Sequence, residues 1–259
     1  MFALKRRKPV LTGKIVLVTG SSRGIGASIA RLAKSCGAKV IVHGRTETRE
    51  LKRLGKDLNA PCVAFDVSDK ASVEREVGKL AKADFPIDIL INNAGVNPSK
   101  TFQNLSNADW KDIFNANFFG VVNVSRIVIN QMMARKSGGS IVNITSIKGF
   151  THVAGKPGYA SSKAALIQLT ARMAEEFAPY NIRINAVAPG FVGTEMTAAT
   201  LEQEEKLGKT KLRDQIAKIP MRRMAEAEEI AEVVCFLASD KAGYITGQCL
   251  AVDGGLSIV

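Results

Sequence analysis

Short hydrophobic runs alternate with longer amphipathic stretches along this chain. Residues 14–19 read Lys-Ile-Val-Leu-Val-Thr, an apolar and β-branched run that is typical of a strand buried on both faces of a sheet. Comparable runs predict further strands at residues 39–42, 62–65, 87–91, 140–144, 182–187 and 249–252. Helical patterns fill the intervals, ending at residue 35 in the first and covering roughly residues 46–58, 69–83, 108–134, 158–178 and 226–238 in later ones.

Repeated strand–helix units require a parallel sheet with helices on both faces. We therefore predict an α/β protein with a doubly wound parallel sheet of the Rossmann type, in three α/β/α layers. A chain of 259 residues is long enough for one such domain, and no linker, repeat or low-complexity segment divides it. Residues 1–12, which include the cluster Lys5-Arg6-Arg7-Lys8, are predicted to be a short basic leader that lacks the apolar run of a secretory signal.

Glycine and polar residues follow six of the predicted strands. They are Thr19-Gly20, Gly44-Arg45, Asp66, Asn92-Asn93-Ala94-Gly95, Thr145-Ser146 and Pro189-Gly190. Open parallel sheets bind ligands at the carboxyl ends of their strands, near the point where the strand order reverses. These residues therefore predict a continuous ligand-binding rim.

The first of these strand ends runs into a glycine-rich stretch, Gly20-Ser21-Ser22-Arg23-Gly24-Ile25-Gly26. Glycines between a strand and a helix let the backbone approach a phosphate closely, and the helix N-terminus supplies free N–H groups. The spacing is G-x-x-x-G-x-G and differs from the common G-x-G-x-x-G. Its place after a strand favours a cofactor site over a simple turn.

A phenol and an ammonium group lie one helical turn apart at Tyr159 and Lys163, and Ser146 precedes the tyrosine by thirteen residues. A positive charge beside a tyrosine lowers its pKa from about 10 and makes it a better proton donor. The alternative is a pair of ordinary surface neighbours, which is the commoner outcome for an isolated Tyr–Lys pair.

The amino-acid composition limits the class of protein and the kinds of site that the chain can form. Hydrophobic content of 46% and charged content of 23% are typical of a globular protein, and no apolar run is long enough to cross a membrane. The four cysteines form no C-x-x-C pair and there are only two histidines, so we predict no metal site and a reduced intracellular setting.

The net charge of +12 indicates an acidic partner or ligand. Nucleic acid is the weakest candidate because the chain has no helix-turn-helix or zinc signature. An acidic carrier protein or an anionic cofactor explains the charge equally well.

Taken together, the motifs resemble those of the classical short-chain dehydrogenase/reductase family over about residues 13–259. The motifs are Thr19-Gly20-x-x-x-Gly24-Ile25-Gly26, Asn92-Asn93-Ala94-Gly95, Ser146, Tyr159-x-x-x-Lys163 and Pro189-Gly190-x-Val192-x-Thr194. The resemblance implies a nicotinamide cofactor and hydride transfer at a carbonyl carbon.

The resemblance also implies residue roles. Tyr159 would be the general acid, Lys163 would lower the tyrosine pKa and hold the ribose, and Ser146 would hydrogen-bond the substrate oxygen. Asn117 matches the family's fourth catalytic position; its structural alternative is a helix residue at a kink. The implied cofactor-binding residues are Gly20, Ser22, Arg23, Gly24, Ile25, Gly26, Arg45, Asp66 (to adenine), Val67, Asn93, Ala94, Gly95, Tyr159, Lys163, Pro189, Gly190, Val192 and Thr194 (to the carboxamide).

NADP(H) is the predicted cofactor. Family members that prefer NAD usually carry an acidic residue at the end of the second strand, where this chain has Gly44 followed by Arg45. Arg23 and Arg45 together suit a 2′-phosphate, which guanidinium groups bind with paired hydrogen bonds. The alternative is that both arginines are solvated surface residues.

Residues 236–247 and the Asp253-Gly254-Gly255 ending are most similar to β-ketoacyl-[acyl-carrier-protein] reductases, which implies reduction of a 3-oxoacyl thioester in fatty acid synthesis. Arg135-Lys136 and Arg172 are candidates to face an acidic acyl carrier protein. The resemblance further implies a homotetramer and a cytoplasmic location, or an organelle matrix in a eukaryote.

The segment of about residues 194–225 leaves the identity of the substrate undecided. It is longer than in typical carrier-protein reductases, and we predict that it forms a mobile lid over the substrate, with His152 as a possible neighbour. The alternatives are a reductase or dehydrogenase for a sugar, steroid or small ketone, and a non-catalytic dinucleotide-binding protein.

Overall fold

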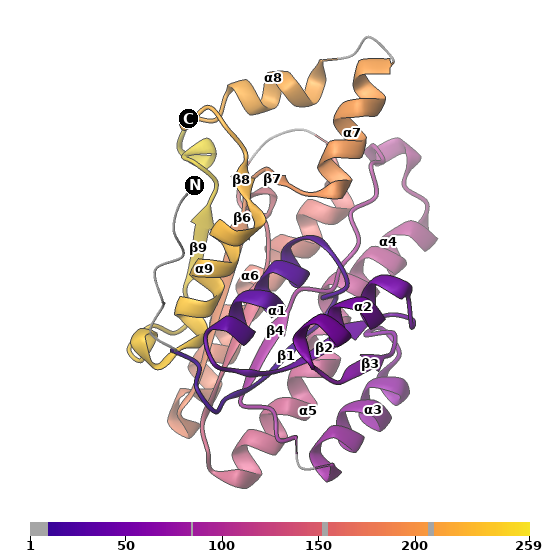
Figure 1. The fold of residues 1–259 in the computed structure, drawn as a ribbon. Coiled ribbons are helices and arrows are strands. Elements are labelled where there is room, and N and C mark those ends of the chain that lie inside the picture. The colour runs from indigo at the N-terminus through magenta and orange to yellow at the C-terminus, as the bar shows by residue number, and fades with distance from the viewer. Residues whose placement is uncertain (1–9, 84, 152–154, 207–209) are drawn as a thin grey trace.

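A single parallel sheet forms the centre of the molecule (Figure 1). The computed structural model describes residues 10–83, 85–151, 155–206 and 210–259. Within them, the sheet has the strand order β3-β2-β1-β4-β5-β6-β9. The strands are β1 (Ile15–Val18), β2 (Lys39–Gly44), β3 (Cys62–Ala64), β4 (Ile89–Asn92), β5 (Gly139–Ile144), β6 (Ile182–Pro189) and β9 (Cys249–Val252). The predicted doubly wound fold is confirmed, with its switch point between β1 and β4.

Helices cover both faces of the sheet. One layer contains α1 (Gly24–Ser35), α2 (Arg49–Leu58) and α9 (Ala227–Ala238). The other contains α3 (Lys70–Lys82), α5 (Gly120–Arg135) and α6 (Pro157–Phe177). Short 3₁₀ turns lie at Phe102–Asn104, Ile147–Gly149, Ala178–Tyr180, Asp240–Ala242 and Leu256–Ile258.

The alternation of side chains along β1 explains why its whole sequence is apolar. Val16 and Val18 pack into the core beneath α1, α2 and α9, whereas Ile15 and Leu17 pack beneath α3, α5 and α6. A strand with helices on both sides has no face on which a polar residue is solvated. Burial of each such side chain contributes roughly 1.5–3 kcal/mol before entropy costs.

The N-terminal boundary of the domain lies earlier than the sequence predicted. Leu11 is fully buried and its backbone N–H donates to Cys36 O at 2.9 Å, while Val10 packs against the same core. Residues 10–12 are therefore part of the domain and not of a leader. The rest of the predicted leader, residues 1–9, lies outside the described residues.

Side-chain caps set several helix starts. Asp69 Oδ1 accepts hydrogen bonds from Ala71 and Ser72 N–H and begins α3; the sequence allows either Ser68 or Asp69 as this cap, and the structure selects Asp69. Ser106 and Asp109 form a reciprocal capping box at the start of α4 (Asn107–Phe114).

The predicted long helix over residues 108–134 is interrupted. A π-helical turn, Asn115–Phe119, separates α4 from α5. Helical backbone runs through the whole predicted range, and the π turn lies at the kink considered for Asn117; hydrophobic periodicity does not detect a single turn that takes in one more residue. Such turns are frequent at functional sites, and this one carries Asn117.

Two helices that the sequence did not predict lie within residues 194–225. They are α7 (Glu195–Lys206) and α8 (Lys211–Ala217), at the top of Figure 1. The short strands β7 (Val192–Gly193) and β8 (Ala225–Glu226) pair in parallel and bring the two ends of this segment together. The segment therefore leaves and rejoins the domain at one place, next to the end of β6.

Candidate active site

The glycine loop has the backbone that a phosphate site needs. Gly20 and Gly24 have φ values of +63° and +56°, which favour glycine over residues with a side chain. A Cβ on Gly26 would lie 2.4 Å from both Asn93 Nδ2 and Gly20 O. Because α1 begins at Gly24 with no acidic residue in its first turn, its N-terminus favours an anion. These residues fit the diphosphate of a dinucleotide.

The side chain of Asn93 holds the glycine loop in place through hydrogen bonds. Its Nδ2 donates to Thr19 O at 3.0 Å and to Gly20 O at 2.9 Å, which uses both amide hydrogens. Thr19 Oγ1 in turn accepts the backbone N–H groups of Asn93 and Ala94 at 3.0 and 3.1 Å. The sequence predicted Asn93 as a cofactor ligand, whereas its amide hydrogens position the glycine loop.

Asp66 and Val67, predicted near the adenine, have different surroundings. Asp66 Oδ1 accepts from the N–H and hydroxyl of Ser68 at 2.9 and 2.7 Å. Partial burial works to raise the pKa of Asp66, but these hydrogen bonds and the charge of Arg45 outweigh it and lower the pKa. Val67 is buried against Gly120, so its side chain belongs to the core.

The residues after β6 return to the glycine loop. Thr194 lies against Gly24, since a Cβ on Gly24 would be 3.6 Å from Thr194 Cγ2. Thr194 also begins α7, accepting Ala198 N–H at its carbonyl at 2.9 Å. Gly190 packs closely on Asp253, and Val192 is buried, so their side-chain positions serve packing. The fold thus joins two predicted cofactor segments that are 170 residues apart in the sequence.

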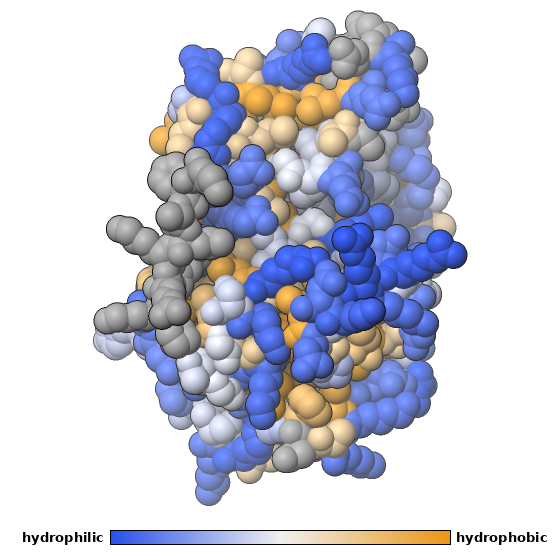
Figure 2. Space-filling view, viewed as in Figure 1, coloured by the Kyte–Doolittle hydropathy of each residue, from blue (hydrophilic) through white to orange (hydrophobic). Residues whose placement is uncertain are grey.

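The two candidate phosphate-binding arginines are exposed at the end of β2 and the start of α1. Their charges act on nearby carboxylates, Arg45 on Asp66 and Arg23 on Glu50. Figure 2 shows hydrophilic residues gathered over α2. A Cβ on Gly44 would lie 3.1 Å from both Leu51 Cδ2 and Thr46 O, so the position where NAD-preferring relatives carry an acidic residue is crowded here.

Ser146, Tyr159 and Lys163 meet at the end of β5. Ser146 is the residue before a 3₁₀ turn, with its Oγ accepting Lys148 N–H at 3.2 Å, and it hydrogen-bonds the Tyr159 hydroxyl. Pro157 in the first turn of α6 starts the helix that carries the other two residues. Lys163 is buried, and its Nζ donates to Ile144 O at 2.8 Å and lies 5.7 Å from the Tyr159 ring centroid.

The predicted direction of the tyrosine pKa shift was wrong for this structure. Burial raises the pKa of Tyr159, and the hydrogen bond from Ser146 opposes the rise without reversing it. Burial also lowers the pKa of Lys163 to about 8. Sequence spacing indicated that the two groups are close, but not that both are desolvated, which disfavours the charged form of each.

Asn117 is fully buried in the π turn and connects three segments. Its Oδ1 accepts Val96 N–H at 2.8 Å, and its Nδ2 donates to Val96 O and to Ser162 Oγ, both at 3.0 Å. Ser162 Oγ donates onward to Tyr159 O at 2.8 Å. Asn117 therefore holds the segment after β4 against the helix that carries Tyr159, as its structural alternative implies, and its catalytic role stays a prediction.

We expect Asn117→Ala to destabilise the protein by about 2–4 kcal/mol, because it removes three buried hydrogen bonds and leaves the Val96 backbone groups without a partner. Urea unfolding measures this loss. Asn123→Ala is the matched control, since Asn123 makes one hydrogen bond, to Val67 O at 3.0 Å. Equal stabilities of the two variants would contradict the bracing role.

The sequence analysis missed a buried polar network beneath the site. Asn92 Nδ2 donates to Ser125 Oγ and Asn143 Oδ1 at 3.0 and 2.9 Å, and Asn143 Nδ2 donates to Thr170 Oγ1 at 2.9 Å. The available signal was an asparagine at or near the end of each of two strands that are mainly apolar. His43, discussed below, was missed as well.

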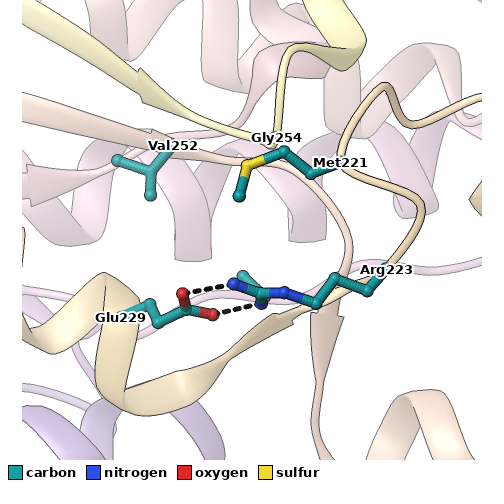
Figure 3. A pocket seen from close by; sticks show the side chains of 6 residues that line it. Met221, Arg223, Glu229, Val252 and Gly254 are labelled. Atoms are coloured by element: carbon teal, nitrogen blue, oxygen red, sulfur yellow. Dashed lines mark hydrogen bonds and ion pairs between the residues drawn. The ribbon is translucent and has the colours of Figure 1, made fainter.

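One small cavity, near the C-terminal end of the sheet strand β9, does not contain the predicted catalytic residues. Its volume is about 80 Å³, and Met221, Arg223, Ala225, Glu229, Val252 and Gly254 line it (Figure 3). There the Arg223 guanidinium makes two hydrogen bonds to the Glu229 carboxylate, at 2.6 and 2.7 Å. This ion pair connects the C-terminal end of the 194–225 segment to α9.

Two basic positions proposed from the sequence for carrier binding lie away from the site. Arg135 donates to Ile87 O at 2.8 Å, next to the start of β4 and thus at the opposite edge of the sheet. Arg172 is about 20 Å along α6 from Tyr159 and pairs with Glu175 at 2.9 Å. His152 lies outside the described residues. Within the described residues, no cluster of metal-ligating side chains occurs and no helix is long and apolar enough to cross a membrane.

Comparison with known proteins agrees with this geometry. Residues 20–257 match the family described as Enoyl-(Acyl carrier protein) reductase. A 3-oxoacyl-[acyl-carrier-protein] reductase from Thermotoga maritima is 38% identical over 254 residues, covering 96% of this chain and 99% of the relative. The chain belongs to the short-chain dehydrogenase/reductase family.

Other similar family members have different names. Nodulation protein G from Rhizobium sp. is 39% identical over 252 residues, covering 96% of this chain and 99% of the relative. The crystal structure of a putative gluconate dehydrogenase from Agrobacterium tumefaciens superposes with a TM-score of 0.90 at 30% identity, covering 98% of this chain and all of the other. Family membership makes the protein an oxidoreductase of alcohols or carbonyl compounds that uses a nicotinamide dinucleotide.

Proposed function

We propose that the protein is an NADP(H)-dependent reductase that converts a carrier-bound 3-oxoacyl thioester to the 3-hydroxyacyl form. The similarity to 3-oxoacyl-[acyl-carrier-protein] reductases over nearly the whole length of both chains carries the choice of substrate. The grouping of Ser146, Tyr159 and Lys163 at the end of β5 supports the reaction type.

When bound, the reduced nicotinamide supplies the hydride that adds to the carbonyl carbon. Tyr159 Oη then gives its proton to the oxygen of the developing alkoxide, and Ser146 Oγ hydrogen-bonds that same oxygen. The phenol of Tyr159 is protonated at neutral pH and so holds the proton to be transferred, although its raised pKa makes it a weaker acid than a free phenol. Lys163, with a pKa of about 8, is mainly charged at pH 7 and holds this end of β5 through Ile144 O.

The segment 194–225 supports the proposal that the substrate is covered during the reaction. Its two helices lie above the carboxyl edge of the sheet, and its ends are joined by β7 and β8 (Figure 1). A cover of this kind excludes water from the hydride-transfer site.

Dehydrogenation of a sugar acid or similar small alcohol is the second candidate. The close superposition on a putative gluconate dehydrogenase favours it. Both candidate reactions use the same proton-transfer residues. They differ only in the substrate that can bind beneath the segment 194–225.

A panel of carbonyl substrates distinguishes the two candidates. We expect NADPH oxidation with a 3-oxoacyl thioester, and at least about 10-fold lower kcat/KM with sugar-derived ketones, steroids and small diketones, a difference of about 1.4 kcal/mol in transition-state binding. Absorbance at the reduced-nicotinamide band measures the rate. Inactivity on the thioester with turnover of another class would refute the proposed substrate and leave the family assignment intact.

We also propose a homotetramer that meets an acidic carrier at the carboxyl edge of the sheet. Two large hydrophobic side chains are exposed, Phe102 in the 3₁₀ turn before α4 and Phe119 in the π turn between α4 and α5, and they support self-association. Sedimentation of the whole chain tests the assembly, and a monomer would refute it.

A further inference from the structure

His43 lies beneath the glycine loop, on the inner side of the site already described. It is the penultimate residue of β2 and its side chain is buried. Its Nδ1 accepts the backbone N–H of Gly20 at 3.0 Å, and its Nε2 lies 2.9 Å from Phe65 O. The imidazole therefore joins the first glycine of the loop to the residue before Asp66.

These two contacts determine the tautomer. The Gly20 N–H is a donor, so Nδ1 must be the unprotonated acceptor. Phe65 O is an acceptor, so Nε2 must carry the hydrogen. A second proton would place an N–H at Nδ1 against the N–H of Gly20 and would break that hydrogen bond.

The backbone of His43 holds the same loop. Its N–H donates to Ser21 Oγ at 2.8 Å, and its carbonyl accepts Ser21 N–H at 2.9 Å. The ring also packs on Phe65, with centroids 4.1 Å apart. A residue that served only to fill the core would need neither nitrogen to be placed in this way.

We propose that neutral His43 is a positioning residue that holds Gly20 and the end of β3 in the arrangement that binds the dinucleotide. It acts through the backbone of the loop and does not contact the reacting atoms. The proposal rests on nicotinamide binding by the family and not on the proposed thioester or the preference for NADP(H).

The surroundings support the neutral state. Burial lowers the pKa of His43 to about 4, while the hydrogen bond to Phe65 O and the charge of Asp66 act in the opposite direction. Arg45 is the other charged group at this corner, and it acts on Asp66. Because the folded pKa lies below the unfolded value of about 6.5, the stabilisation is complete above pH 6.5 and is lost as pH falls toward 4.

Three substitutions separate the hydrogen bonds from packing. His43→Asn retains an oxygen near the Nδ1 position, His43→Gln retains a donor near the Nε2 position, and His43→Leu retains bulk alone. We measure the dissociation constant by fluorescence, without a carbonyl substrate, for whichever of NADPH and NADH the wild type binds more tightly, and expect it to rise about 10-fold or more in the Leu and Gln variants. The Asn variant is expected to stay within about 3-fold of the wild type. Equal weakening by Asn and Leu, or no weakening by Leu, would overturn the proposal.

A measurement on the unmodified chain keeps the proposal testable if variants fail to fold. The chain has two histidines, so ¹⁵N NMR with His152→Gln as the assignment control identifies the His43 imidazole. We expect one neutral tautomer with hydrogen on Nε2 at pH 7, and loss of Gly20 amide protection as pH falls through about 4. A charged imidazole or the Nδ1–H tautomer at pH 7 would overturn it.

Discussion

Tyr159→Phe is expected to lower kcat for carbonyl reduction by about 10²–10⁴-fold while leaving the NADPH dissociation constant near the wild-type value. The substitution removes the hydroxyl that we propose as the proton donor and retains the ring that packs beside Lys163. A hydride that reaches the carbonyl carbon leaves an alkoxide, and without a positioned acid that charge has to be met by water. Steady-state kinetics and cofactor fluorescence measure the two quantities separately.

Tyr180→Phe is the matched control for this experiment. Tyr180 is half exposed in a 3₁₀ turn after α6, so loss of its hydroxyl should not affect turnover. If Tyr159→Phe retained more than about one tenth of the wild-type kcat, the assigned proton donor would be wrong. If Tyr159→Phe also lost NADPH binding, the loss of turnover could not be assigned to proton donation, and Tyr159 would instead be a residue that positions the cofactor.

The double substitution of Arg23 and Arg45 by alanine is expected to raise the KM for NADPH by about 10²-fold or more and to leave the KM for NADH nearly unchanged. Hydrogen bonds between charged groups contribute about 1.5–3 kcal/mol each, and only NADPH carries the 2′-phosphate. Both side chains are exposed at the edge of the glycine loop, so their removal does not disturb the core.

Arg31→Ala controls for the general effect of positive charge. Arg31 is on α1 and pairs with Asp57 at 3.2 Å, so its replacement removes one positive charge, half of the charge lost in the double variant, from a position that is committed to another contact. Equal losses with NADPH and NADH in the double variant would contradict phosphate recognition. A wild-type preference for NADH would do the same, and in that case Glu50, which Arg23 influences, would be the first acidic residue to test.

The strands, most helices and the order of the site motifs could be predicted because each depends on local pattern. Apolar β-branched runs such as residues 14–19 have no stable place outside a sheet that is covered on both faces. Asp69 caps α3 because its side chain reaches N–H groups only two and three residues away. Such contacts involve only residues that are neighbours in the sequence, so the sequence pattern predicts them.

Features that depend on residues distant in the sequence could not be predicted in the same way. The π turn around Asn117 is held by contacts to Val96 and Ser162, and periodicity in the surrounding helix says nothing about them. The helices α7 and α8 lie in a charge-rich segment with weak amphipathic pattern, and the β7–β8 pair that bounds them joins residues 33 positions apart.

The sequence by itself determined the fold class, the family and the residue types available for proton transfer and phosphate binding. Only the tertiary structure decided how those groups behave, because pKa values and tautomers depend on burial and on partners that the fold brings together. It raised the pKa of Tyr159 where spacing to Lys163 predicted a lower one. It gave the side chain of Asn93 a bracing role, and it set His43 beneath Gly20 as a neutral acceptor.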